Sequence, residues 1–333
     1  MAQYYRPVLM QNSVRPDNAR TVAGGWCWFD QAERITRGRA RDLVGIDAIP
    51  VDVVERISTP RAPIAGMPMD EPCLMGILNV TPDSFSDGGK FNAPEAALMR
   101  ARQMVAEGAD ILDIGGESTR PGANFVPADI EISRTAPIIA AIHAELSTPI
   151  SIDTRKLPVA LAAVSAGAGL INDVSAFTYE PELIDFAAKS GLPVCIMHAQ
   201  GSPKNMQTAP QYDDVLLDVY DFLEERVEAC ESAGIPRSSI MIDPGIGFGK
   251  TTQHCLNLLR DISLFHSLGC SILLGASRKA FIGDITNVNS AEDRTFGSVS
   301  VAIWAAAQGV QVLRVHDIEA TKQAIALQMA IRG

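Results

Sequence analysis

Residues 75–89 begin as an apolar run and change abruptly into polar and turn-forming residues. Asn79 stands where the run ends, and Phe85 and Asp87 lie in the polar stretch that follows, residues 81–89. A buried strand that opens into a loop of Asn, Thr, Asp and Ser residues is how α/β enzymes present chemical groups. An ordinary turn after a strand is the alternative, and the rest of the chain weighs against it.

Seven further apolar runs also end in polar side chains. The segments that carry them are residues 113–122, 153–155, 172–173, 198, 243–250, 277–279 and 314–317. A buried polar group costs free energy unless it has a partner. Chance placement does not readily explain the pattern at every run, so we expect these side chains to share a ligand site.

The polar side chains form two chemical sets. Hydrogen-bond acceptors and an amide come from Asp113, Asp153, Asn172 and Asp243. They suit a flat nitrogen heterocycle with several N–H donors. Cations come from Arg120, Lys279, Arg314 and His316. They suit a phosphate or a carboxylate.

The glycine-rich residues 245–250 look like a phosphate-binding loop, but their spacing fails. A Walker A motif needs a glycine separated by four residues from its Gly-Lys pair, and Pro244 stands at that place before Gly249 and Lys250. The dinucleotide pattern G-x-G-x-x-G fails as well. We expect these glycines to let the backbone turn tightly beside a ligand.

Short apolar runs and helical patterns alternate from residue 73 onward. The runs are residues 73–80, 111–115, 149–153, 170–174, 193–198, 240–244, 271–277 and 310–316. The helical patterns are residues 92–107, 129–146, 158–166, 181–190, 213–233, 252–268, 291–307 and 318–331. Eight strand–helix units in ~260 residues match a (β/α)₈ TIM barrel. A doubly wound open sheet is the alternative.

Four polar residues keep a structural alternative within such a barrel. Asp113 and Asp173 could brace neighbouring loops, and His198 could be a core histidine. Arg278 could form an ion pair at the barrel rim.

Residues 1–71 differ from the rest and are predicted to be an N-terminal extension of unknown role, while residues 72–333 form the barrel. The aromatic cluster at residues 24–29 is expected to be a small packing core, and residues 58–72 read as a linker. The extension could cover a barrel end or contribute to oligomerisation.

The composition is that of a globular protein with a sizeable core, since 47% of the 333 residues are hydrophobic and 20% are charged. The net charge of −11 argues against generic binding to nucleic acid or to an anionic membrane. Six scattered cysteines without a C-x-x-C pair favour buried reduced thiols in a cytoplasmic protein. No run reaches the ~18 apolar residues that span a bilayer, and the N-terminus lacks the apolar core of a secretory signal.

Taken together, the motifs make the chain similar to the dihydropteroate synthase family of folate biosynthesis. The matching segments, in the family's order, are residues 75–89, 113–123 (DIGGESTRPGA), 151–156 (SIDTRK), 172–173, 197–206 (MHAQGSPKNM), 243–250 (DPGIGFGK), 275–279 (GASRK) and 314–317 (RVHD). The resemblance covers residues 73–333 and leaves the first 71 residues outside. It implies a (β/α)₈ barrel, usually a homodimer, with Mg²⁺ assisting.

The resemblance also implies a reaction. The family condenses 6-hydroxymethyl-7,8-dihydropterin diphosphate with p-aminobenzoate, giving dihydropteroate and pyrophosphate. We expect a dissociative substitution in which pyrophosphate leaves first and the arylamine then attacks the CH₂ cation. Positioning and electrostatics would then supply the catalysis, without a protein nucleophile. Sensitivity to sulfonamides, which are analogues of p-aminobenzoate, is expected as well.

The resemblance assigns roles by motif. The implied pterin-binding residues are Asp153, Asn172, Asp243, Lys279 and Arg314. Those implied for p-aminobenzoate are Phe85, Thr119, Pro121, Phe248, Ser277 and Lys279. The diphosphate is expected at Asn79, Thr119, Arg120, Arg314 and His316, with Asn79 as the Mg²⁺ ligand. The implied catalytic residues are Arg120, Asp87, Lys279, Arg314 and His316, and residues 81–89 and 118–123 resemble two mobile loops.

Two positions depart from the family pattern. Ala280 follows the Ser-Arg-Lys triplet where many members have serine, so a backbone N–H there is left to meet the p-aminobenzoate carboxylate. Arg155 stands where smaller or polar residues are common and is expected to point to the rim. A methyltetrahydrofolate-dependent methyltransferase is the alternative function, since it would share Asp153, Asn172 and Asp243 but has no use for a diphosphate site.

Overall fold

Eight parallel strands close into a barrel in this computed structural model, which describes residues 2–332 except 81–92, 119–122, 202–205 and 207. The strands are β6 (Cys73–Asn79), β7 (Ile111–Gly115), β8 (Ile150–Asp153), β9 (Leu170–Asp173), β10 (Val194–Met197), β11 (Ile240–Asp243), β12 (Ser271–Leu274) and β13 (Val312–Val315). They pair in chain order, and β13 closes the ring against β6. The predicted TIM barrel is therefore confirmed, and the open sheet is excluded.

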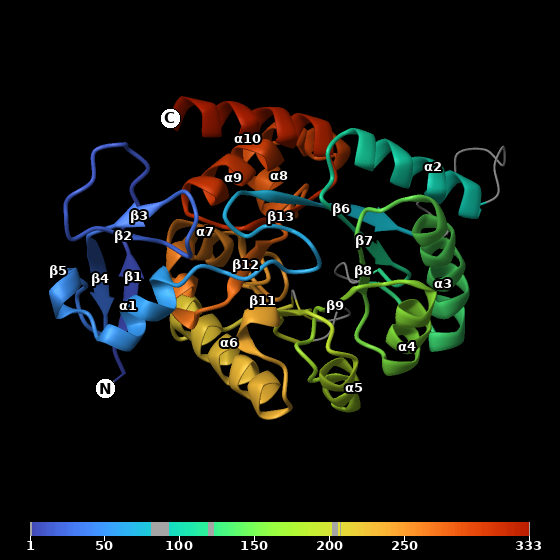
Figure 1. Ribbon diagram of the computed structural model, residues 1–333, viewed down its shortest axis with the longest axis horizontal. Helices are drawn as coiled ribbons and strands as arrows, with labels where there is room; N and C mark the ends of the chain where they lie inside the picture. Colours follow the sequence, from blue (N-terminus) through green and yellow to red (C-terminus); the bar gives the residue numbers. More distant parts are fainter. Residues whose placement is uncertain (1, 81–92, 119–122, 202–205, 207, 333) are drawn as a thin grey trace.

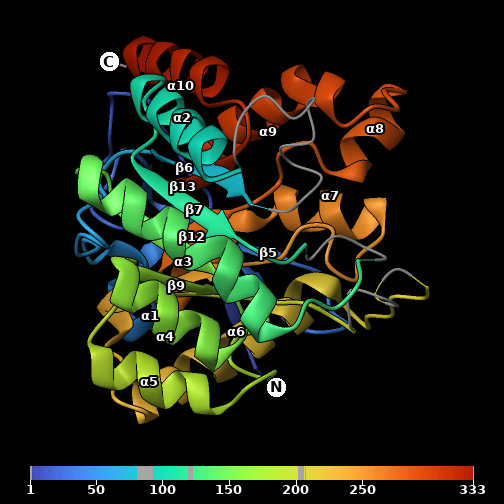
Figure 2. The same ribbon diagram turned by 90° about the vertical axis from the view of Figure 1, so that its right-hand side faces the viewer.

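Helices cover the outside of the barrel (Figure 1). They are α2 (Ala93–Ala106), α3 (Ala128–Glu145), α4 (Leu157–Ala166), α5 (Glu182–Ser190), α6 (Val215–Ser232), α7 (Thr252–Arg260), α8 (Ala280–Thr286), α9 (Thr295–Ala307) and α10 (Ile318–Arg332). Figure 2 shows α2, α3, α4 and α5 following one another along one side, and consecutive pairs of them are in contact.

Two predicted helices differ from the observed ones. The pattern at residues 252–268 divides at Asp261 into α7 and the 3-10 helix η4 (Ile262–Leu268). The apolar spacing continues through η4 because all of its residues are buried, so periodicity alone did not reveal the change. The pattern at 291–307 begins with the 3-10 helix η5 (Glu292–Arg294) before α9. A further short 3-10 helix, η3 (Arg237–Ser239), precedes β11.

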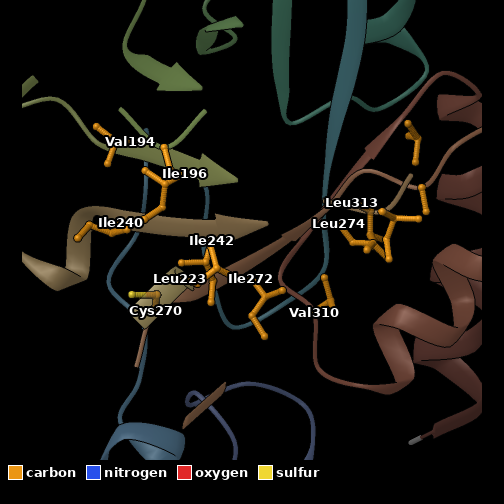
Figure 3. Close-up of a cluster of buried hydrophobic side chains, with 14 of the residues drawn as sticks. Val194, Ile196, Leu223, Ile240, Ile242, Cys270, Ile272, Leu274, Val310 and Leu313 are labelled. Atoms are coloured by element: carbon orange, nitrogen blue, oxygen red, sulfur yellow. The ribbon is translucent and has the colours of Figure 1, made fainter. Parts of the chain in front are cut away.

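Alternate residues of the strands face two different layers. Val194, Ile196, Ile240 and Ile242 belong to the large core between the strands and the outer helices, and Figure 3 shows them packed together. Cys195, between two of them, belongs instead to a second cluster inside the barrel. Because both faces of a parallel barrel strand are covered, these strands read as continuous apolar runs.

The extension forms a small layer of its own at one side of the barrel (Figure 1). Its antiparallel sheet contains β1 (Tyr4–Pro7), β4 (Gln31–Ile35) and β5 (Asp42–Gly45), beside the pair β2 (Arg20–Thr21) and β3 (Trp28–Phe29). The short helix η1 (Ile46–Ala48) and α1 (Val51–Ser58) follow. The aromatic cluster is a packing core, as predicted, because Trp26, Cys27 and Phe29 are buried together.

Polar contacts fasten the extension to the barrel. Trp26 Nε1 donates to the carbonyl of Ala306 at 2.7 Å. Arg37 forms ion pairs with Asp218 at 2.6 Å and with Asp221 at 2.7 Å. The extension therefore packs against barrel helices, while the division of the chain at residue 71 stays a prediction.

The linker interpretation of residues 58–72 is wrong. Ile64, Met67 and Met69 are buried inside the end of the barrel where the strands begin, and Ile64 and Met67 pair through their backbones. They pack against inward-facing side chains of β6, β7 and β9 to β13, namely Cys73, Met75, Ile111, Leu170, Cys195, Met241, Leu273 and Val312. This segment therefore closes the N-terminal end of the barrel, and we call residues 64–69 the barrel plug.

The six cysteines are all buried and free, as their spacing predicted. Burial raises the pKa of Cys73 and of Cys270 to about 12, so these thiols stay protonated at neutral pH. Among the described helices, none has the length and apolar character that a membrane crossing requires.

Candidate active site

Five polar side chains from five strands meet at the C-terminal end of the barrel. Their order along the chain is Asp113 on β7, Asp153 on β8, Asn172 on β9, Asp243 on β11 and Arg314 on β13. The carboxyl ends of parallel barrel strands share one rim, which is why residues far apart in sequence converge there. The structure thus brings together four of the residues predicted for the pterin, and Asp113 with them.

Arg314 links two of the carboxylates. Its Nε donates to Asp113 Oδ2 at 2.6 Å, and a terminal nitrogen donates to Asp153 Oδ2 at 2.8 Å. Asn172 Nδ2 also donates to Asp113 Oδ2, at 3.2 Å. Asp113 is fully buried, and its Oδ2 accepts from the side chains of two other strands, Arg314 and Asn172.

Two buried carboxylate oxygens remain without a partner. Asp113 Oδ1 and Asp153 Oδ1 have no hydrogen bond within the part of the chain that the structure describes. An unpaired buried acceptor costs ~1–3 kcal/mol. Such atoms in a native structure point to donors that a ligand would bring. A heterocycle with N–H groups on one edge would supply them.

The electrostatics of the cluster favour a ligand that is rich in donors. Burial raises the pKa of Asp153, and Arg314 acts in the opposite direction. Burial likewise raises the pKa of Asp243, which faces Lys279. Burial lowers the pKa of Lys279 to about 8, against the pull of Asp243. Perturbed groups in one concave end of a barrel are typical of a functional site.

Glycines leave room beside these charges. A side chain on Gly115 would start 3.4 Å from Asn79 Oδ1 and 3.7 Å from Asp153 Oδ2. A side chain on Gly275 would start 3.4 Å from Asp243 Oδ2 and 3.8 Å from Cδ of Arg314. Gly115 and Gly275 therefore leave space next to the carboxylates of Asp153 and Asp243, where a flat ligand could approach the acceptor oxygens.

A second group of residues lies around β12, β13 and the loop after β11. Ser277 Oγ accepts from the backbone N–H of His316 at 3.2 Å and lies 3.0 Å from His316 Nδ1. Lys279 Nζ donates to the carbonyl of Ile246 and lies 4.5 Å from the centroid of the Phe248 ring. Ser277, Lys279, Phe248 and His316 thus form the cationic and aromatic part of the site.

The glycines at residues 245–249 make the tight turn that the sequence predicted. Gly245, Gly247 and Gly249 all have a positive φ, at 68°, 80° and 62°. A side chain on Gly245 would start only 1.9 Å from the carbonyl oxygen of His198. The turn is therefore packed against the loop after β10, and it presents the Ile246 carbonyl to Lys279.

Asp173 and His198 have structural positions. The carboxylate of Asp173 accepts from the backbone N–H groups of Ser175 and Phe177, at 2.7 and 2.8 Å, and so braces the loop after β9. His198 is buried and its Nδ1 lies 2.8 Å from Lys250 Nζ. Burial, with a smaller effect of Lys250, lowers the pKa of His198 to about 2, so it is a neutral core histidine.

Arg278 and Arg155 both lie at the rim of the barrel. Arg278 is paired with Asp317, which confirms the structural alternative for that residue. Arg155 is mostly buried, lying 3.5 Å from Glu117 and 4.1 Å from the centroid of the Tyr179 ring. It therefore points to neighbouring loops and not into the carboxylate cluster.

Several predicted residues lie outside the described part of the chain. They are Phe85, Asp87, Thr119, Arg120 and Pro121, and their roles stay predictions. Sequence reasoning also gave no role to Lys156, the last residue of the matching segment 151–156. Its buried Nζ lies 2.6 Å from Glu131 of α3 and 3.1 Å from Glu117, so it links the loop after β8 to α3 and to the loop after β7.

The donor set fits Mg²⁺ only in part. The described residues contain no group of three or more His, Cys, Asp and Glu side chains that could hold a metal ion. Asn79 offers a hard oxygen at the end of β6, half-buried and beside Asp153 across Gly115. Mg²⁺ usually keeps several waters and takes few protein ligands plus substrate phosphates. The described residues therefore supply at most part of a Mg²⁺ site, and phosphate oxygens and water would have to complete it.

Comparison with known proteins places this barrel in a family. The family model described as "Pterin binding enzyme" matches residues 75–316, which span the whole ring of strands after the first two residues of β6. The chain belongs to the pterin-binding enzyme family.

Curated members of the family resemble the chain over most of its length. Dihydropteroate synthase of Escherichia coli K12 is 45% identical over 257 residues, which are 77% of this chain and 90% of the relative. The Synechocystis enzyme of the same name is 44% identical over 250 residues, 75% of this chain and 86% of the relative.

Solved structures of family members share the fold. The Yersinia pestis dihydropteroate synthase in a sulfonamide drug complex aligns with a TM-score of 0.77 at 44% identity, covering 82% of this chain and 99% of that chain. The Xanthomonas albilineans enzyme has been solved with 4-aminobenzoic acid and with 7,8-dihydropteroate. These two structures align with TM-scores of 0.78 and 0.76, at 46% and 43% identity, each over 82% of this chain and over 98% and 99% of their own.

Proposed function

We propose that this chain is a transferase that condenses 6-hydroxymethyl-7,8-dihydropterin diphosphate with p-aminobenzoate, giving dihydropteroate and pyrophosphate. The observation that carries the proposal is the buried cluster in which Asp113 and Asp153 each keep an unpaired acceptor. A pterin offers an amino group and ring N–H groups that match these acceptors. The relatives reported above, named dihydropteroate synthases, add support from identity over most of the chain.

The two parts of the site fit the two substrates. Asp153, Asn172 and Asp243 would read the edge of the pterin, while Lys279 and Arg314 would border it. Phe248, Ser277 and Lys279 would hold p-aminobenzoate, together with Phe85, Thr119 and Pro121 from segments outside the described residues. A methyltetrahydrofolate-dependent methyltransferase would leave the cationic part of the site, at Ser277, Lys279 and His316, without a use.

The reaction that suits this site is a dissociative substitution at the pterin CH₂. Arg314 and His316, joined by Asn79, Thr119 and Arg120, would hold the diphosphate and stabilise the charge that grows as it leaves. The carboxylates would keep the pterin ring in place while the arylamine attacks. Catalysis would come from positioning and from fixed charges, which together can lower a barrier substantially.

Magnesium is part of the proposal as a partner of the diphosphate. Asn79 would ligate it, with the remaining ligands from phosphate oxygens and water. When bound, the ion would neutralise negative charge on the leaving group. The buried reduced cysteines also support action in the cytoplasm.

The function is tested by an assay for pyrophosphate release with the dihydropterin diphosphate, p-aminobenzoate and Mg²⁺. We expect turnover that depends on p-aminobenzoate and that a sulfonamide inhibits competitively against it. A well-folded chain with no such turnover would overturn the proposal. Release of pyrophosphate that continues at the same rate without p-aminobenzoate would point to a hydrolase.

Arg120→Ala should lower turnover at least ~100-fold, the scale for losing one contact to a charge in the transition state. The reason is that the motif places Arg120 at the diphosphate and not at the pterin ring. Binding of a pterin without the diphosphate, measured by calorimetry, should change little. An equal loss of pterin affinity would show that the loop at residues 118–123 has been misassigned.

A homodimer is proposed as the assembly. The support in this chain is an apolar groove of about 440 Å³ along α7, α8 and α9, lined by side chains that include Ile282, Ile285, Val301 and Trp304. Ile285 and Trp304 are 52% and 45% exposed in the single chain. A second copy of the chain would cover them.

Ile285→Glu should convert a dimer into a monomer in light scattering after gel filtration, because a charge in an apolar interface loses its hydration without a partner. Leu327→Glu is the matched control, since Leu327 is 63% exposed on α10, away from the groove. The control should keep the dimer mass. Loss of the dimer in both variants, or in neither, would contradict this assignment of the interface.

A further inference from the structure

The backbone of Arg278 is left-handed, with a φ of 60°. This residue stands between Ser277 and Lys279, the two residues of the loop after β12 that belong to the candidate site. Residues that carry a Cβ are sterically destabilised in this conformation, whereas glycine is not. Such strain persists only when the surroundings hold it, and it gathers at functional sites.

Four contacts hold Arg278 in place. Its side chain forms a two-pronged ion pair with Asp317, with nitrogen–oxygen distances of 2.5 and 3.0 Å. Its backbone N–H donates to Ser298 Oγ at 2.8 Å. Its carbonyl accepts from Arg294 at 3.0 Å. Ser298 Oγ in turn donates to the carbonyl of Arg294 at 2.7 Å, so the backbone on both sides of the strained residue is fixed by one connected set of contacts.

The same ion pair joins the two arms of the cationic part of the site. Asp317 directly follows His316 at the end of β13, and Arg278 directly follows Ser277. Ser277 and His316 are themselves in contact, with 3.0 Å between Ser277 Oγ and His316 Nδ1. On the other side of Arg278, Lys279 reaches the carbonyl of Ile246 and the ring of Phe248. The directions of Ser277, Lys279 and His316 therefore all depend on the backbone that Arg278 and Asp317 hold.

We propose that Arg278 and Asp317 are positioning residues: their ion pair holds the left-handed backbone that aims Ser277 and Lys279 at the substrates and keeps His316 against Ser277. This inference rests on the proposed function, since the reaction is its readout. The guanidinium of Arg278 then acts through Asp317 and not on the diphosphate.

The competing role for Arg278 is direct contact with an anionic substrate. Two observations argue against a direct contact. Nε and one terminal nitrogen of Arg278 already donate to the Asp317 carboxylate, and the Arg278 side chain is only 26% exposed. Burial raises the pKa of Asp317, but the hydrogen bonds and the charge of Arg278, with smaller effects of Thr295 and His316, together outweigh burial and bring the pKa below its ordinary value. The pair is thus ionised throughout the neutral range, and Arg278 would have to leave a charged partner to reach a substrate.

Two substitutions of one residue distinguish these roles. Arg278→Gly and Arg278→Ala both delete the guanidinium, but only glycine adopts a left-handed backbone without strain. In the alanine variant the backbone at residue 278 should relax to a negative φ. The fraction of molecules in which Ser277 and Lys279 are positioned for the reaction should then fall. We expect kcat/KM of the alanine variant to lie at least ~10-fold below that of the glycine variant, and the glycine variant to stay within about tenfold of the unsubstituted chain.

The ring of His316 gives a second readout that a loss of stability alone would not move. The chain has only five histidines, so their ring resonances can be assigned by NMR. The His316 signal should shift further from its position in the unsubstituted chain in Arg278→Ala than in Arg278→Gly, because both variants lose the ion pair with Asp317 but only the alanine variant also displaces Ser277. Asp317→Asn, which weakens the same pair, should resemble the alanine variant.

Asn287 provides the matched control. It also has a left-handed backbone, with a φ of 58°, but it lies at the other end of α8 from Lys279. Asn287→Ala should lower the unfolding temperature without changing kcat/KM of the folded enzyme. Equal loss of kcat/KM in Arg278→Gly and Arg278→Ala would overturn the inference and show a direct substrate contact. If the unsubstituted chain has no p-aminobenzoate-dependent activity, the proposed function fails, and an unshifted His316 signal in Arg278→Ala would then overturn the positioning role as well.

Discussion

Arg314→Leu should lower the free energy of unfolding by ~3–5 kcal/mol, the cost of breaking a buried ion pair on one side. It should also reduce turnover at least ~1000-fold, the upper range for removing one charge-stabilising contact. Both effects have the same origin. The guanidinium of Arg314 lies between Asp113 and Asp153 and donates to both, so its removal leaves two buried carboxylates without their shared cation.

The loss of stability should depend on pH. In the intact chain burial raises the pKa of Asp153, and Arg314 lowers it. Without Arg314 the folded-state pKa rises further above the unfolded value, so the folded variant binds more protons than the unfolded chain. Its stability is then greatest below the unfolded pKa and is lost as the pH rises through the folded one. In urea unfolding, the free energy of unfolding of Arg314→Leu should therefore lie closer to that of the intact chain at about pH 5 than at about pH 8.

Asp113→Asn is the control for this prediction. It removes one charge but keeps the shape of the side chain, and Arg314 still has Asp153 as a partner. The variant should lose less stability than Arg314→Leu, with little pH dependence of the difference. If Arg314→Leu unfolds at the same urea concentration as the intact chain at both pH values, the carboxylates do not depend on Arg314 in the way the geometry indicates.

The barrel could be predicted because short stretches of the sequence carry the signals for its strands and helices. Each parallel strand is covered on both faces, so runs such as those of β10 and β11 are almost wholly apolar. The chain must also reverse through a helix between parallel strands, which gives the alternation its regular spacing. Parallel order then places every strand's C-terminal end at one rim, so Asp153, Asn172 and Asp243 could be expected together before any contact was known.

The contacts within the site could not be predicted in the same way. Asp113 and Arg314 are separated by 201 positions in the chain, and Arg278 and Asp317 by 39. Residue types indicate that charges will need partners, but the partner is decided by strand register and by rotamers. For Asp113 the sequence therefore left a brace and a ligand contact open, and for Arg278 it left an ion pair and a substrate contact open.

The barrel plug was missed for a different reason. Residues 58–72 are rich in proline and interrupted by glycine, which is typical of a linker. Only Ile64, Met67 and Met69 enter the barrel, and three apolar residues without periodicity carry no signal of a strand or helix. Their burial follows from an open end of the barrel that needs an apolar cover, which is a property of the whole fold.

Met67→Asp should lower the free energy of unfolding by at least ~3 kcal/mol. The change removes the burial of a methionine, worth ~1.5–3 kcal/mol, and places a carboxylate among apolar side chains at an additional cost. Met67 is 2% exposed and its cluster consists of side chains such as Met75, Met241 and Leu273. Chemical denaturation followed by tryptophan fluorescence would measure the loss.

Two controls separate the plug from a general effect of the substitution. Met67→Leu keeps the apolar volume and should cost less than ~1.5 kcal/mol. Leu43→Asp makes a similar change in the same extension at a position that is 61% exposed, and it should cost little.

Because the plug lies at the end of the barrel opposite to Asp153 and Arg314, kcat of the folded fraction of Met67→Asp should be unchanged at low temperature. If Met67→Asp were as stable as Leu43→Asp, residues 64–69 would be a linker after all. If it is destabilised as expected, the extension completes the barrel core, and a chain that begins at residue 72 should not fold stably.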